Sequence, residues 1–139
     1  MKVITETFSI STLGNSTLVD ITKSVEEILF KIGLSEGQVT IFIPGATAGV
    51  TTIEYEPGLL QDFPEALERI APSHISYHHD ATWQDGNGHA HVRASMIGPS
   101  LSVPFQNRQL LLGTWQQIVV VDCDVRPRKR RVIVQFIGQ

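Results

Sequence analysis

The chain has 139 residues, of which 42% are hydrophobic and 18% charged, with a formal net charge of −3. This length fits one domain over residues 1–139, and the many apolar residues exclude a chain that is disordered throughout. The single cysteine, Cys123, excludes an internal disulfide framework and a CxxC motif, and its apolar surroundings are typical of a core residue. Because no apolar run is long enough to span a membrane and no signal-peptide pattern is present, we expect a soluble, cytoplasmic protein.

The first third of the chain mixes strand and helix patterns. Lys2–Ile10 alternates with a period of two, which predicts a half-buried strand, and Leu18–Ile21 predicts a short one. Thr22–Gly33 has an N-cap residue, apolar residues at helical spacing and a final glycine, so it predicts a helix. Gln38–Pro44 predicts another strand, and the small, polar segment Gly45–Thr52 predicts a loop.

The rest of the chain begins with a second helix and continues mostly as strands. Pro57 suits a first helical position, and an apolar stripe extends to Ile70, although Pro64 should break the helix. Ser73–His91 has no periodicity and contains all five histidines of the chain. The last strands are predicted at His89–Ile97, Ser100–Pro104, Leu110–Leu112, Trp115–Asp124 and Arg131–Ile137. Two helices followed by an antiparallel run predict an α+β fold, mostly antiparallel sheet.

The most informative motif is His89-Ala90-His91. In an extended segment, residues two apart project from the same face, so the two imidazoles could bind one metal ion. His78, His79 and Asp80 precede the motif and could supply a third ligand. A polar surface loop with solvated histidines is the alternative interpretation.

Several other polar residues are candidates for a site, and each also has a structural interpretation. Asp85 could orient an imidazole or act as an acid or base, or it could only shape the turn with Asn87. Thr47 lies among small residues that could hold an anion. Glu54 could act as a general base or form a solvated pair with Glu56.

The basic run Arg126–Arg131 has two interpretations. Such a run can bind phosphate or nucleic acid, but the chain is acidic overall and the run has no aromatic residues, which makes nucleic acid an unlikely partner. A basic turn whose charges pair with Asp122 and Asp124 is the favoured interpretation. Trp115 and Gln116 begin an apolar strand and could form a pocket wall or a subunit contact.

Several of these motifs together resemble the YjbQ family over essentially the whole chain. They are Asp85–Ser95, Gly98–Ser100, Leu112–Gln117, Arg126–Val132 and Thr47–Glu54. The name "secondary thiamine-phosphate synthase enzyme" is attached to that family. The resemblance implies a small α+β protein that assembles as a trimer, with histidines and a glutamate in a metal-binding pocket near subunit boundaries.

By position, the resemblance assigns site roles to His79, His91 and Glu54. Many members have a histidine and a threonine where this chain has Gly45 and Ala46. We therefore expect His89 to replace that imidazole, so that His79, His89 and His91 form the metal set.

Three functions follow as hypotheses. A thiamine-phosphate synthase would use Arg93 and the basic run for phosphates and the Tyr77 and Trp115 rings beside a pyrimidine; Thr47, Asn87 and Gln116 complete the expected ligand-binding set. A metal-dependent hydrolase would use Glu54 or Asp85 as the base. A non-catalytic trimer with a structural metal or anion site is the third. Three histidines suit zinc, whereas magnesium, expected if phosphate substrates are used, prefers oxygen ligands.

Overall fold

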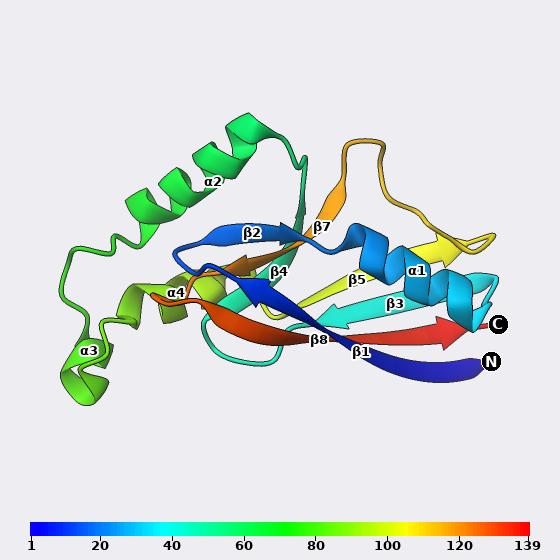
Figure 1. The fold of residues 1–139 in the computed structure, drawn as a ribbon, viewed down its shortest axis with the longest axis horizontal. Coiled ribbons are helices and arrows are strands. Elements are labelled where there is room, and N and C mark those ends of the chain that lie inside the picture. Colours follow the sequence, from blue (N-terminus) through cyan, green and yellow to red (C-terminus); the bar gives the residue numbers. More distant parts are fainter.

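The computed structural model describes residues 1–139, which form eight strands and four helices in two antiparallel sheets (Figure 1). The strands are β1 (Lys2–Thr12), β2 (Thr17–Asp20), β3 (Glu36–Phe42), β4 (Ala48–Ile53), β5 (Ser100–Gln106), β6 (Gln109–Leu110), β7 (Gln117–Asp122) and β8 (Arg128–Gly138). The helices are α1 (Thr22–Ile32), α2 (Pro57–Ile70), α3 (His78–Trp83) and α4 (Gly88–Ile97). The α+β prediction is therefore confirmed, with four helices in place of two.

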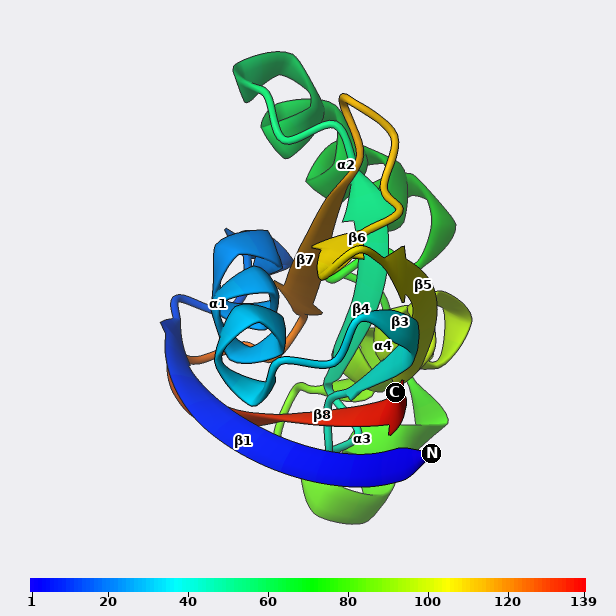
Figure 2. The same ribbon diagram turned by 90° about the vertical axis from the view of Figure 1, so that its right-hand side faces the viewer.

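The larger sheet has the strand order β1-β8-β3-β5-β6 and curves around the helix α1 and the smaller sheet (Figure 2). Its concave face carries apolar residues at alternate positions, which pack on α1 through side chains such as Val25 and Leu29. Phe105 and Phe136 lie edge to face in this core, with ring centroids 6.0 Å apart. This alternation is what the period-two pattern of the strands predicts.

The smaller sheet has the order β2-β7-β4, and its central strand β7 is buried on both faces. Ile118 and Val120 face the main core, whereas Val119, Val121 and Cys123 face a second core formed with α2 and α4. A strand covered on both sides is apolar at every position rather than at alternate positions. The prediction that Cys123 is a core residue is confirmed.

The helix α1 follows its sequence pattern closely. Gly33 ends the helix with φ +74°, the left-handed conformation that glycine adopts without strain. Thr22 is the first helical residue rather than the N-cap, which is Ile21; the Asp20 carboxylate accepts the backbone N–H of Thr22 at 3.0 Å. None of the helices is both long and apolar enough to cross a membrane.

Three local predictions were wrong. His89–Ile97 is not a strand but belongs to α4, where Ala90, Arg93 and Ala94 are buried at helical spacing. The segment 48–52 of the predicted loop Gly45–Thr52 belongs to the strand β4, which pairs with β7 along its whole length. Its small residues let α4 pack closely, since a Cβ on Gly49 would lie 2.6 Å from Ile97. Pro64 lies inside α2 without ending it.

The convex face of the larger sheet has no charged residue in three successive rows of paired residues. Val3, Phe42 and Ile137 on this face are exposed apolar side chains. The rows are Val3, Ile137, Gln38 and Pro104; Thr5, Gln135, Thr40 and Ser102; and Thr7, Ile133, Phe42 and Ser100.

Candidate metal centre and cavity

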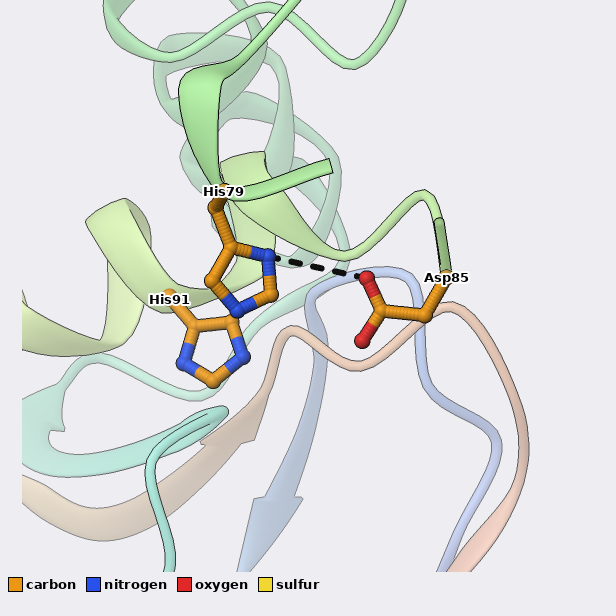
Figure 3. A group of neighbouring side chains, drawn as sticks. All are labelled: His79, Asp85 and His91. Atoms are coloured by element: carbon orange, nitrogen blue, oxygen red, sulfur yellow. Dashed lines mark ion pairs between the residues drawn. The ribbon is translucent and has the colours of Figure 1, made fainter. Parts of the chain in front are cut away.

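Two imidazoles and one carboxylate from three different segments meet at one point (Figure 3). His79 lies on α3, His91 on α4, and Asp85 on the turn that joins these helices. One ligand atom of each residue lies within 4.8 Å of the other two. The turn therefore brings together residues that the sequence separates by up to twelve positions.

His79 has an unsatisfied buried nitrogen. Its Nδ1 atom lies 3.6 Å from Asp85 Oδ1 and 3.7 Å from Asp80 Oδ1, and it has no hydrogen-bond partner. A buried polar atom without a partner is costly. Two atoms that are each about 2.1 Å from one tetrahedral ion lie about 3.4 Å apart, so the His79–Asp85 spacing fits two ligands of one metal ion.

The position of the cluster depends on hydrogen bonds and close packing around the turn. Asp80 Oδ1 accepts the N–H of Gly88 at 2.9 Å, and Asp85 Oδ1 accepts the N–H of Asn87 at 3.2 Å. Gly88 touches Tyr77, since a Cβ added there would lie 2.7 Å from Tyr77 Cγ. The Tyr77 hydroxyl donates to the carbonyl of Pro72 at 2.7 Å, which ties the ring to the segment before α3.

A cavity of about 550 Å³ opens beside the cluster and is lined mainly by charged and polar residues. Its lining consists of Ala46, Thr47, Asp85, Asn87, His91, Asp124, Val125, Arg126, Arg128 and Arg130. Asp85 and His91 thus belong both to the cluster and to the cavity wall. A small anionic molecule in this cavity would contact the cluster and the basic run together.

Two of the three cavity arginines donate side-chain hydrogen bonds to buried aspartates. Arg130 donates to Asp122 from Nε at 2.8 Å and from Nη2 at 3.0 Å, and Arg128 donates twice to Asp124, at 3.0 and 3.1 Å. The interpretation of the basic run as a turn that pairs with Asp122 and Asp124 is confirmed. These pairs hold the start of β8 against the end of β7.

Asp124 is the centre of this network. Burial alone would raise its pKa, but hydrogen bonds from Thr47, Arg128, Asn87 and the Arg126 N–H outweigh burial and leave the pKa below its ordinary value. The Thr47 hydroxyl donates to Asp124 at 3.0 Å, and the Asn87 amide donates to it at 3.3 Å. Asn87 also accepts the N–H of Val125 at 3.1 Å, so it links α4 to the β7–β8 turn.

His89 lies elsewhere, because it is on a helix rather than a strand. Helical residues two positions apart point about 200° away from each other, so His89 and His91 cannot share a face. His89 is 5% exposed and its ring centroid lies 6.3 Å from that of Tyr77. Burial, followed by the nearby Arg93 charge, lowers its pKa. The same-face geometry that was expected for the two histidines is wrong.

Arg93 is also directed away from the cavity. Its guanidinium donates to the carbonyl of Ala71 from Nε at 3.0 Å and from Nη2 at 2.8 Å, and to the Ser16 hydroxyl at 3.0 Å. Nη2 also pairs with Glu68. The side chain is 4% exposed, and these contacts connect α4 with the end of α2 and with the β1–β2 turn.

Glu54, Trp115 and Gln116 lie around a different, shallower cavity of about 430 Å³. Gln116 is held there by a hydrogen bond of 3.1 Å to the Thr52 hydroxyl, whereas Trp115 is 73% exposed on the loop before β7. None of the three residues lines the cavity beside His91. Within one chain, the predicted site residues therefore fall into two separate groups.

A family model described as UPF0047 protein YjbQ-like matches residues 6–139. The chain belongs to this family. It is 36% identical over 129 residues to a UPF0047 protein of Archaeoglobus fulgidus, covering 93% of this chain and 98% of that one. It is 33% identical over 135 residues to UPF0047 protein YugU of Bacillus subtilis, covering 96% and 98%.

Solved structures of the YjbQ-like family have the same fold. A YbjQ-like protein of unknown function from Sulfolobus solfataricus superimposes with a TM-score of 0.93 at 33% identity, covering 99% of both chains. A YjbQ/UPF0047 protein from Clostridium acetobutylicum superimposes with a TM-score of 0.87 at 34% identity, covering 95% of this chain and 99% of that one.

Gly45 and Ala46 occupy the positions where the resemblance implies a histidine and a threonine. Both residues line a small cavity of about 170 Å³ together with His91. Gly45 has φ +113°, a backbone conformation that residues other than glycine rarely adopt. The segment is therefore next to the cluster but offers no side-chain ligand from these two positions.

The aspartates of the network were not among the predicted site residues. Asp122 and Asp124 are both fully buried, where an aspartate is almost always paired. Their sequence signal is the placement of two acidic residues at the end of a fully apolar strand and directly before a basic run. That pattern predicted the ion pairs but not that the pairs would form the wall of a cavity.

Proposed function

We propose that His79, Asp85 and His91 of this YjbQ-like protein bind a divalent metal ion, and that the adjoining cavity binds a phosphorylated small molecule. The main support for this proposal is that Asp85 and His91 belong to the ligand cluster and also line the same cavity as the basic run. The function that this arrangement supports best is metal-dependent hydrolysis of a phosphoester.

The ligand set favours zinc or a similar ion over magnesium. Two imidazole nitrogens and one carboxylate oxygen are typical zinc ligands, whereas magnesium is usually bound through oxygen atoms alone. The partnerless Nδ1 of His79 supports this assignment. His79, Asp85 and His91 would hold the ion, which would supply Lewis-acid activation of water and of a phosphoryl oxygen.

The other residues of the site would have separate roles in such a reaction. Asp85 is the carboxylate that belongs to both the ligand cluster and the cavity wall, and it would hold the ion or accept a proton from water. Thr47 and Asn87 would keep the cavity wall in place through Asp124, since their polar groups already make hydrogen bonds there. Arg93 would stabilise α4 rather than contact the ligand.

Thiamine-phosphate synthase activity is the second candidate. It is supported by the basic cavity, because pyrophosphate is the leaving group when a pyrimidine diphosphate joins a thiazole phosphate, and arginines stabilise such charge. The Tyr77 ring packs near His89 and Trp115 lies at another cavity, so neither ring lies beside this site within one chain. We therefore rank this activity below hydrolysis.

We also propose that the protein assembles as a homotrimer in the cytoplasm. The uncharged convex face of the larger sheet supports self-association, because burying it leaves no unpaired charge. Glu54 lies at a different cavity within one chain, so its expected role as a base would require a neighbouring chain of such an assembly. A trimer with a purely structural metal site is the non-catalytic alternative.

Metal content and activity should be measured together on the untagged protein. We expect about one zinc-like ion per chain by plasma mass spectrometry, lost in His79→Ala and His91→Ala but retained in His74→Ala, a control on an exposed histidine outside the cluster. Hydrolysis of a phosphoester panel should stop on chelation and return with zinc. Rescue of a thiamine-requiring strain without hydrolysis would favour the synthase. Absence of stoichiometric metal would refute the proposal.

A further inference from the structure

The three arginines of the cavity differ in how many hydrogen bonds their guanidinium groups make to other residues of the chain. Arg130 and Arg128 are each bound twice by a buried aspartate, and Arg130 also donates to the Thr47 hydroxyl at 2.6 Å. Arg126 makes no side-chain hydrogen bond; its Nε lies 4.0 Å from Asp124 Oδ1, and the side chain is 68% exposed. Arg126 is therefore the least engaged arginine of the cavity, with only a distant ion pair to Asp124, and its exposed guanidinium is accessible to a ligand.

The backbone fixes where this free side chain begins. The N–H of Arg126 donates to Asp124 Oδ1 at 3.2 Å, and the ring of Pro127 restricts the backbone of Arg126, the residue before it. Asp124 is in turn held by Thr47, Asn87 and Arg128. The guanidinium can thus move at the cavity wall while its Cα is anchored by a buried network.

We propose that Arg126 is the specificity-determining contact for the substrate of this site, and that the group it binds is the dianionic phosphate of a phosphomonoester. This inference rests on the proposed function, because the metal ion supplies the second positive charge. Among the residues that line the cavity and their ion-pair partners, a divalent ion beside Asp85 leaves one net positive charge, and Arg126 adds another, since Asp122 and Asp124 offset Arg130 and Arg128. Two net positive charges match a phosphate dianion, whereas a diphosphate would carry excess negative charge.

The test is calorimetric titration of inorganic phosphate into zinc-loaded and metal-free protein. We expect Arg126→Gln to weaken phosphate binding about tenfold or more, the loss of one charge-assisted contact, with unchanged zinc content and unfolding temperature. Arg108→Gln is the matched control, because Arg108 is an exposed arginine at another cavity and its loss should change nothing. Wild-type phosphate affinity in Arg126→Gln would overturn the inference while leaving the metal site intact.

Two further outcomes separate this inference from the proposed function. If the protein binds no metal, the proposed function fails, and the titration of the metal-free protein decides whether Arg126 still binds phosphate. If the metal-free wild type binds phosphate and Arg126→Gln weakens that binding, the result supports Arg126 as the phosphate contact. If the metal-free wild type binds no phosphate, the result overturns that assignment. Pyrophosphate that binds more tightly than phosphate to the zinc-loaded protein would overturn the choice of a phosphomonoester.

Discussion

The imidazole rings of His79 and His91 lie 4.2 Å apart between centroids, although they belong to different helices, α3 and α4. Asp85, on the turn that joins these helices, lies beside the two rings (Figure 3). His89, two residues before His91, is buried beside Tyr77 instead. Neighbouring histidines of one motif therefore have different surroundings, and the following prediction separates their roles.

Replacing His89 should leave metal binding intact. In a His89→Gln variant we expect about one zinc ion per chain, as in the wild type, because the ring is not part of the ligand cluster. Plasma mass spectrometry measures this, with circular dichroism to verify folding and His91→Ala as the metal-free comparison. Loss of zinc from a folded His89→Gln protein would return His89 to the ligand set.

The Asp122→Asn substitution should destabilise the protein strongly. It removes the charge that Arg130 pairs with at two atoms in a buried setting, and unpairing a buried ion costs about 3 kcal/mol or more. Urea unfolding measures the loss. The exposed Asp62 on α2 provides a control, Asp62→Asn, which should change the unfolding free energy by less than about 0.5 kcal/mol. Equal stability of both variants would mean that the network does not stabilise the fold.

Glu68 should make stability depend on pH in acid. Hydrogen bonds from the Ser73 backbone and then from Arg93 lower its pKa from 4.5 to about 2. A lowered folded pKa gives stability that is present above pH 4.5 and lost as the pH falls toward 2. Because the side chain is 42% exposed, solvent screening reduces the effect to about 1 kcal/mol.

Glu68→Gln should therefore be less stable than the wild type at pH 7, and the difference should shrink between pH 4.5 and pH 2. Urea midpoints at pH 7, 4.5 and 2.5 would show this trend. Glu27→Gln, at an exposed position on α1, is the control and should show no such convergence. A difference that stays constant down to pH 2.5 would contradict the assignment.

Adding a methyl group at the start of α4 should cost stability. Alanine favours helices over glycine by about 1 kcal/mol, but in Gly88→Ala the Cβ would overlap Tyr77, and overpacking costs about 1–3 kcal/mol. We expect a net loss in thermal unfolding and weaker zinc binding, because Tyr77 directly precedes α3 and is two residues from His79. Gly113→Ala has room for its methyl group and should be neutral. A stabilised Gly88→Ala protein would show that Tyr77 can move freely.

A charge in the middle of the convex sheet face should prevent self-association. Thr40 lies in the central uncharged row, between Gln135 and Ser102, so Thr40→Glu would place a carboxylate within any contact that buries this face. Light scattering after size-exclusion chromatography should detect a lower mass than for the wild type. Glu6→Gln, on the other face of β1, should keep the wild-type mass. An assembly that survives Thr40→Glu would use another surface.

The sequence was sufficient for the parts of this fold that depend on local periodicity. The strand Lys2–Ile10, the helix ending at Gly33 and the buried run around Cys123 all follow from patterns that packing reinforces. The segment His89–Ile97 was wrongly predicted as a strand because the buried face of this helix consists of histidine, alanine and arginine, which give no hydrophobic stripe. Tertiary contacts, such as those of Arg93 with Ala71 and Ser16, decide its conformation and cannot be seen in the sequence.

The sequence also predicted the candidate site only in part, because tertiary contacts decide which residues meet. His79, Asp85 and His91 were each named as site residues, but their meeting depends on the α3–α4 turn, which no periodic pattern indicates. The pairing of the basic run with Asp122 and Asp124 was predictable because opposite charges flank one turn. The separation of Glu54 and Trp115 from that cavity could not be foreseen, because it depends on how the two sheets are placed.

The position of β8 between β1 and β3 has a consequence for synthesis on the ribosome. Thr5 pairs with Gln135, so about 130 further residues must be synthesised before β1 can pair with its neighbour β8. Until then, both β1 and β3 expose unpaired backbone edges that other nascent chains could bind. We therefore expect the larger sheet to form late, only after β8 has been synthesised, and chaperones that shield strand edges to raise the yield of folded protein.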